Sequence, residues 1–211
     1  LHGRRVGVRS YTLTPRVWMR GILQSAYRVN PQQVQWVLFG DEHVAEYVAP
    51  ANVTPAPDGS DMVAMLLAGE IDAAIGVSGV DAPEIKPLIP EPRRAAITHF
   101  QQTGIYPISH LVVVKDELLH AHPWLAEELW SLFKAAKDNY LGCLRDSAPQ
   151  TPQDEAMQAM RQVIGDDPLL YGVAPNQKTL EAFIRFNVEQ QTIPQPVTVE
   201  EIFPHSVLAL A

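Results

Sequence analysis

Short apolar runs alternate with longer amphipathic stretches over the first hundred residues. The apolar runs are rich in β-branched and small residues and have the length of buried strands. These runs lie at residues 5–9, 34–39, 71–77 and 85–89. Stretches with helical spacing and capping residues lie between them, at 15–28, 61–67 and 92–104, and a proline-rich loop is expected at 49–57. The alternation predicts a doubly wound α/β lobe with a parallel sheet.

The second half of the chain changes character. One more strand is predicted at 108–115, and the pattern after it is almost entirely helical. A broad apolar helix face extends from Trp124 to Tyr140, and two further helices are predicted at 153–164 and 176–191. We expect these helices to pack on a second sheet, and the chain supplies no further strands for one.

Composition and the single cysteine indicate an ordinary folded protein of the cytoplasm. The chain is 46% hydrophobic and 19% charged, as in an ordinary folded protein. No apolar run reaches the roughly eighteen residues of a membrane span, so no membrane partner is expected. Cys143 cannot form an internal disulfide, which fits a cytoplasmic location. The sequence begins at Leu1 with no signal-peptide pattern, and a removed leader or an upstream domain stays open.

Positive charge is concentrated at the start of the chain. The first forty residues hold six arginines and no Asp, Glu or Lys, whereas the whole chain carries a formal charge of −8, which leaves −14 for residues 41–211. A positive segment in an acidic protein predicts a site for a small anion. It lacks the wide basic face and interleaved aromatic residues of a nucleic-acid surface, so no nucleic acid is expected.

The local pattern in this segment fits an anion site. A hydroxyl-rich loop, Ser10-Tyr11-Thr12-Leu13, follows the first strand, and we expect Thr14 to cap a helix whose first residue is Pro15. Free backbone N–H groups and the positive end of the helix dipole would bind a carboxylate or a phosphate there. Arg9 ends the strand directly before this loop, where its guanidinium could bind a carboxylate through two hydrogen bonds.

Two histidines are candidates for proton transfer. Glu42-His43 follows the second strand, at the edge of an α/β sheet where ligands bind. A histidine beside a carboxylate suits proton transfer, but a polar loop with a capping Glu42 is about as good an interpretation. Glu46 could share a helix face with His43, although two residues make no metal site. His110 leads an apolar strand, and its position favours a hydrogen-bonded core histidine over a residue of a cleft.

Other chemistries lack support. Arg20 and Arg28 fall on the polar face of the first helix, where a solvated surface is the simpler interpretation. The chain contains no glycine-rich phosphate loop, CxxC, HExxH or GxSxG motif. These absences weigh against nucleotide binding, metal-dependent hydrolysis and serine hydrolysis.

Several sequence blocks together resemble the 4,5-dihydroxyphthalate decarboxylase family, nearly end to end. The blocks are Gly3–Tyr11 with Thr14, Trp18–Leu23, Glu42–Tyr47, Leu67–Ala74, Thr103–His110, His122–Trp124, Asp167-Pro168, Tyr171-Gly172 and Asn176. One departure from the family pattern is Arg16, where a smaller residue is expected.

The resemblance implies a fold similar to the type 2 periplasmic binding proteins, in which two α/β lobes flank a cleft. On this basis residues 1–106 form an α/β substrate-binding lobe. Residues 107–211 then contribute a crossover strand and the helical C-terminal part of a second, incomplete lobe. The chain would correspond to the latter part of a longer protein.

The resemblance also implies decarboxylation of 4,5-dihydroxyphthalate, a small anionic aromatic substrate, to protocatechuate and CO2 without a cofactor. The expected proton-transfer residues are His43, Glu42 and His110. The expected substrate-binding residues are Arg9, Ser10, Tyr11, Thr12, Thr14, Arg20 and Tyr106. The alternative is a solute-binding protein that holds an organic anion for an ABC-type transporter. A ligand-sensing or biosynthetic relative fits less well, and a homo-oligomer stays open.

Overall fold

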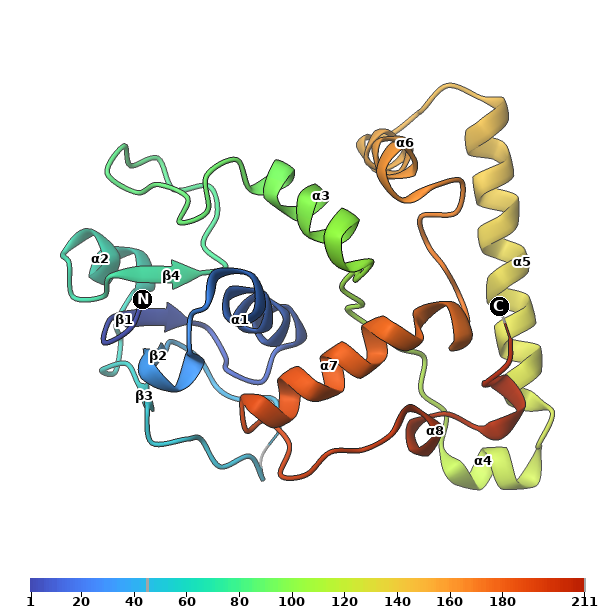
Figure 1. The fold of residues 1–211 in the computed structure, drawn as a ribbon, viewed down its shortest axis with the longest axis horizontal. Helices are drawn as coiled ribbons and strands as arrows, with labels where there is room; N and C mark the ends of the chain where they lie inside the picture. The colour runs from blue at the N-terminus through green and yellow to red at the C-terminus, as the bar shows by residue number, and fades with distance from the viewer. Residues whose placement is uncertain (45, 211) are drawn as a thin grey trace. The chain divides into compact units, whose positions relative to one another are not determined.

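The structure is a computed structural model that describes residues 1–44 and 46–210. The chain divides into two compact units (Figure 1). The first comprises Leu1–Ser109 and Ala182–Pro196, and the second comprises His110–Glu181 and the chain from Val197 onward.

A four-stranded parallel sheet organises the first unit. Its strands are β1 (Arg5–Val8), β2 (Gln35–Leu38), β3 (Val53–Pro55) and β4 (Ala73–Ile75), in the order β3-β2-β1-β4. Because β2 and β4 both pair with β1, the strand order reverses there. The predicted α/β class with a parallel sheet is confirmed.

Buried aliphatic and aromatic side chains explain the sheet. Val6 and Val8 of β1 are fully buried and pack with Trp36 of β2 and with Val34. Tyr11, just after β1, joins the same core and meets Trp36 edge to face. Central β1 is therefore held by apolar contacts as well as by its two neighbouring strands.

Helix α1 (Thr14–Tyr27) links β1 to β2. The N-cap residue is Leu13 and Thr14 is already helical, so the predicted N-cap role of Thr14 is wrong. Trp18 packs on Phe186 of helix α7 (Gln177–Glu189), and a Cβ at Gly21 would overlap the Phe186 ring. Glycine is thus required where the two helices approach each other.

The remaining elements of this unit lie outside the sheet. They are η1 (Pro31–Gln33), α2 (Met62–Leu67) and α3 (Pro92–Thr103). Asp61 caps α2, since its side chain accepts a hydrogen bond from the Ala64 N–H. The strand expected at 85–89 is absent, whereas β3 lies inside the predicted proline-rich loop.

Helices dominate the second unit. They are α4 (Asp116–Ala121), α5 (Leu125–Asp146), α6 (Pro152–Ile164), η2 (Ala174–Asn176), the first residues of α7, α8 (Val199–Ile202) and η3 (His205–Val207). Leu141, Leu144 and Met157 form its core. Lys137 is buried beside them and binds Asp167 and the Leu169 carbonyl.

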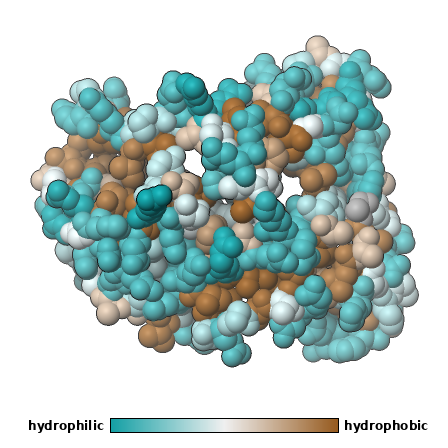
Figure 2. All heavy atoms as spheres, viewed as in Figure 1, coloured by the Kyte–Doolittle hydropathy of each residue, from teal (hydrophilic) through white to brown (hydrophobic). Residues whose placement is uncertain are grey.

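Apolar side chains of this unit are left exposed. The strand predicted at 108–115 is not formed, and Val113 is 89% exposed. On α5, Leu132 and Phe133 of the predicted apolar face are also exposed. Figure 2 shows hydrophobic atoms interrupting a mainly hydrophilic surface. Over the described residues, no helix is long and apolar enough to cross a membrane.

Candidate functional site

The candidate site lies at the carboxyl edge of the sheet, where β1 ends between β2 and β4. In open α/β sheets the reversal of strand order leaves a crevice at this edge, because the loops after the flanking strands turn to opposite sides. Here the loops after β1, β2 and β4 begin at Arg9, Phe39 and Gly76.

The turn after β1 binds a carboxylate, and the carboxylate is that of Glu42. Ser10 Oγ donates to Glu42 Oε2 at 2.7 Å, and the Thr12 N–H donates to the same oxygen at 3.0 Å. The Tyr11 N–H and the Thr12 hydroxyl complete the four donors. We call Ser10, Tyr11 and Thr12 the carboxylate cradle; the cradle joins the loop after β1 to the loop after β2.

Hydrogen bonding keeps Glu42 ionised. Burial alone would raise the pKa of its carboxyl, but the hydrogen bonds from Thr12 and Ser10 outweigh burial and hold that pKa below its usual value. The loop that was predicted to bind an anion thus binds a carboxylate of the protein itself. This places Glu42 as a bound anion and not as a proton acceptor.

Arg20 lies on the other side of the cradle and is completely buried. Its Nη2 donates to the Tyr11 carbonyl and its Nε to Gln190 Oε1, each at 2.7 Å, and Cζ lies 3.6 Å from the Tyr11 ring centroid. The expectation of a solvated face is wrong for Arg20, because Tyr11 and Gln190 cover it. Burial lowers its pKa to about 10, so the guanidinium stays charged at neutral pH.

Two further arginines follow β1 and have no acidic partner among the described residues. Arg9 is exposed, and its backbone and side-chain stem pack on Gly40 after β2, where a Cβ would lie 3.0 Å from the Arg9 carbonyl oxygen. The Arg16 guanidinium lies on Gly76 after β4. No ion pair found among the described residues involves either arginine.

The other predicted residues are placed as follows. His43 is exposed beside Glu42, and Thr14 is half-buried in the first turn of α1. Tyr106 is exposed, meets Phe100 edge to face, and has its pKa raised by partial burial. His110 is exposed at the start of the second unit, so its expected place in a core is wrong: the strand that would have buried it is not formed.

Sequence reasoning missed three residues of this site. Tyr47 stacks on Tyr11 with a centroid distance of 6.3 Å, and its buried hydroxyl has no hydrogen-bond partner among the described residues. Gln190 binds Arg20 across 170 positions of sequence, a separation that no local pattern reveals. Arg16 was visible only as a departure from a family pattern.

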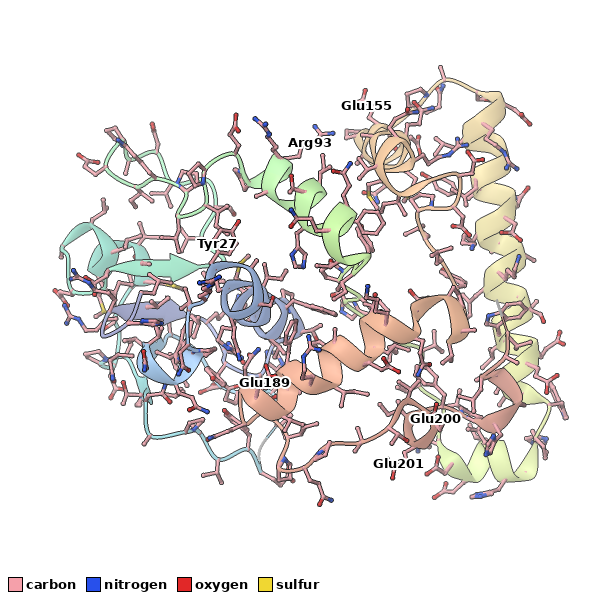
Figure 3. The ribbon with its side chains drawn as sticks, in the orientation of Figure 1. Tyr27, Arg93, Glu155, Glu189, Glu200 and Glu201 are labelled. Carbon is pink, nitrogen blue, oxygen red and sulfur yellow. The ribbon has the colours of Figure 1, made fainter. Side chains whose placement is uncertain are left out.

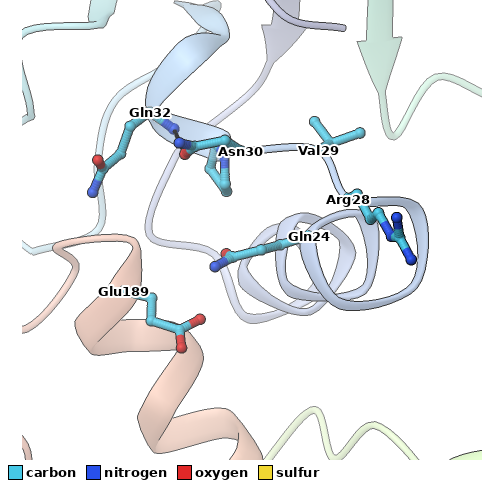
Figure 4. Close-up of a pocket in the computed structure, with 7 residues that line it drawn as sticks. Gln24, Arg28, Val29, Asn30, Gln32 and Glu189 are labelled. Carbon is cyan, nitrogen blue, oxygen red and sulfur yellow. Dashed lines mark hydrogen bonds between the residues drawn. The ribbon is translucent and has the colours of Figure 1, made fainter.

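A separate groove of about 500 Å³ lies at the C-terminal end of α1. Gln24, Arg28, Asn30 and Glu189 contribute polar groups to its wall (Figure 4). None of the predicted site residues lines it. In the described ranges, no cluster of three or more His, Cys, Asp or Glu side chains could hold a metal ion.

The protein is thus of the α/β class, and the carboxyl edge of its sheet carries the carboxylate cradle and three arginines, Arg9, Arg16 and Arg20. No family model matches the chain. A 4,5-dihydroxyphthalate decarboxylase of Comamonas testosteroni is 30% identical over 87% of this chain and 61% of its own length. A second protein of that name, from Pseudomonas putida, is 32% identical over 46% of this chain and 42% of its own length.

These two matches confirm the resemblance that the sequence blocks indicate: the chain is related by sequence to the 4,5-dihydroxyphthalate decarboxylase family. The chain spans about three fifths of the length of the Comamonas relative, 61%.

Proposed function

We propose that the protein is a carboxy-lyase that converts 4,5-dihydroxyphthalate to protocatechuate and CO2 without a cofactor. The observation that carries the proposal is the carboxylate cradle, because it joins two loops and brings Arg9 and His43 to one edge of the sheet. The names of the two relatives support the same substrate. Residues 1–106 would form the substrate-binding lobe, in a type 2 periplasmic-binding-protein-like arrangement and a cytoplasmic setting.

The ring of this substrate can lose CO2 with proton transfer alone. A base removes the proton of the hydroxyl para to the departing carboxylate, and the charge moves to the carbon that bears this carboxylate. An acid protonates that carbon, the carbon–carboxylate bond breaks, and CO2 leaves its electron pair in the ring. The resulting phenolate regains a proton, so the net change is one proton taken up and one CO2 released.

Each step requires a group that the site can supply. Arg9 binds the carboxylate that remains on the ring, since a guanidinium fork matches a carboxylate. His43 donates the proton to the ring carbon, because an imidazole can carry a proton, and the hydroxyl proton is exchanged with water. Glu42 positions the His43 loop through the cradle and stays ionised. Thr14 and Tyr106 complete the substrate-binding set, and no step is assigned to His110.

The alternative is a solute-binding protein that holds the same anion and leaves it intact. The unpaired arginines support a solute-binding protein as well as they support a carboxy-lyase, since an arginine binds an anion without any proton transfer. The test is to incubate the full-length protein with 4,5-dihydroxyphthalate and to follow CO2 and protocatechuate. Equal amounts of the two products support the carboxy-lyase, whereas tight binding with the substrate recovered unchanged supports the solute-binding protein.

A further inference from the structure

Arg16 occupies an unusual position for an arginine. It lies in the first turn of α1, but its guanidinium reaches the end of β4 and covers Gly76. Gly76 has φ of 88°, a conformation that side chains rarely adopt, and a Cβ there would overlap Arg16 Nη2 and Cζ. The glycine thus serves two needs: it permits this turn of the backbone and it leaves space for the guanidinium.

The Arg16 guanidinium has unused binding capacity. Its Nε is buried and has no hydrogen-bond partner among the described residues, and no acidic side chain pairs with it there. An unsatisfied buried N–H is costly and in native proteins calls for an explanation, such as a ligand. Glu42, the carboxylate of the neighbouring loop, is already bound by the cradle.

The charge of Arg16 also acts on its neighbour Arg20. Burial lowers the pKa of Arg20, the Glu42 carboxylate raises it, and the like charge of Arg16 lowers it. A bound carboxylate would offset this repulsion. The free donors of Arg16 could therefore bind an anionic ligand.

Arg9 and Arg16 flank the end of β1 on opposite sides. Arg9 packs on Gly40 after β2, and Arg16 packs on Gly76 after β4. The two carboxylates of a phthalate stand on adjacent ring carbons and diverge from each other. Two arginines that approach the same edge of the ring can therefore bind one carboxylate each.

We propose that Arg16 binds the second carboxylate of an aromatic dicarboxylate and so selects dicarboxylates over monocarboxylates. This inference rests on the proposed function for its substrate class. It concerns binding, however, and a protein that binds the dicarboxylate without decarboxylating it would still satisfy it.

The test compares phthalate with benzoate, which lacks the second carboxylate. Their Kd values are measured calorimetrically on the full-length wild-type protein and on Arg16→Gln, Arg16→Lys and Arg93→Gln. Arg93 provides the matched control, because it is exposed on α3 (Figure 3) and forms no ion pair in the described part of the chain. Thermal melting shows whether each variant is folded.

We expect Arg16→Gln to weaken phthalate binding at least about tenfold, the loss of one charge-assisted pair, and to change benzoate binding less than about twofold. Arg16→Lys should fall between, and Arg93→Gln should match the wild type. The inference is overturned if phthalate and benzoate weaken equally in Arg16→Gln, if neither changes, or if the wild type does not prefer phthalate. Failure of CO2 release with the phthalate preference intact overturns the proposed function alone.

Discussion

Glu42 and Arg20 bind opposite ends of the same peptide group. The Thr12 N–H donates to the Glu42 carboxylate at 3.0 Å, and the carbonyl of this peptide, Tyr11 C=O, accepts from Arg20 Nη2 at 2.7 Å. The peptide dipole is thus aligned between an anion and a cation, and its two hydrogen bonds are charge-assisted. This arrangement locks the turn after β1, from which the exposed Arg9 projects.

Removal of the Glu42 carboxylate should loosen this turn. In Glu42→Ala, two backbone N–H groups and two hydroxyls lose their acceptor, and we expect the free energy of unfolding to fall by about 1–3 kcal/mol. Urea denaturation measures this change. Glu46→Ala, an exposed glutamate in the same loop, serves as the control and should stay within about 0.5 kcal/mol of wild type. Equal stability of the two variants would contradict the cradle.

The contribution of Glu42 should depend on pH. Because the folded state lowers the pKa of this carboxyl, its ionised form stabilises the protein above the unfolded pKa near about 4.3, and this stabilisation is lost as pH falls through the folded pKa. The stability difference between wild type and Glu42→Gln should therefore be constant near neutral pH and shrink in acid. Denaturation series at pH 7 and in steps below pH 5 measure it. A stability difference between wild type and Glu42→Gln that grows in acid would contradict a lowered pKa of Glu42.

Arg20 should be a structural residue of the site. In Arg20→Met, the Tyr11 carbonyl and the Gln190 amide oxygen lose their charged donor inside the protein, and we expect a loss of about 2–4 kcal/mol in unfolding free energy. Arg28→Met is the matched control at the C-cap of the same helix, because Arg28 is exposed, and it should cost less than about 0.5 kcal/mol. Comparable losses of unfolding free energy in the two variants would show that the buried contacts of Arg20 do not stabilise the protein.

His43 should carry the proton transfer. Replacement by Asn removes the imidazole that carries the proton, and kcat for CO2 release should fall about 10²-fold or more. His120→Asn changes an exposed histidine of the second unit and should leave kcat unchanged. Steady-state kinetics over a range of pH measures both variants. Wild-type turnover in the His43 variant would remove this residue from the mechanism.

The α/β class, the anion-binding loop and most helix positions could be predicted because they rest on local patterns. Apolar runs marked β1 and β2, and Asp61 and Gly104 marked helix ends. A strand was predicted at 108–115 because these residues have high β-propensity. The structure forms no strand there, since no described strand pairs with this segment, and pairing is not visible in the sequence. Conversely, β3 was hidden in a proline-rich stretch, since prolines are tolerated on a strand at the sheet edge.

Long-range contacts explain the errors within the site. A free anion was expected in the cradle because nothing local shows that Glu42, thirty residues away, already binds there. Arg20 was assigned to the polar face of α1 by its helical position, but Gln190 and the Tyr11 ring cover that part of the helix. Sequence periodicity shows which helix face a polar side chain is on, but it does not show which distant residues pack over that face.

The most direct test of the account is the kinetics of 4,5-dihydroxyphthalate turnover by wild type, Arg9→Gln and Arg93→Gln in the full-length protein. We predict that wild type and Arg93→Gln release CO2 and protocatechuate in equal amounts at similar kcat/KM, and that Arg9→Gln loses about 10²-fold in kcat/KM because the guanidinium pair with the remaining carboxylate is gone. Wild-type kcat/KM in Arg9→Gln, or no product from the wild type, would contradict the account.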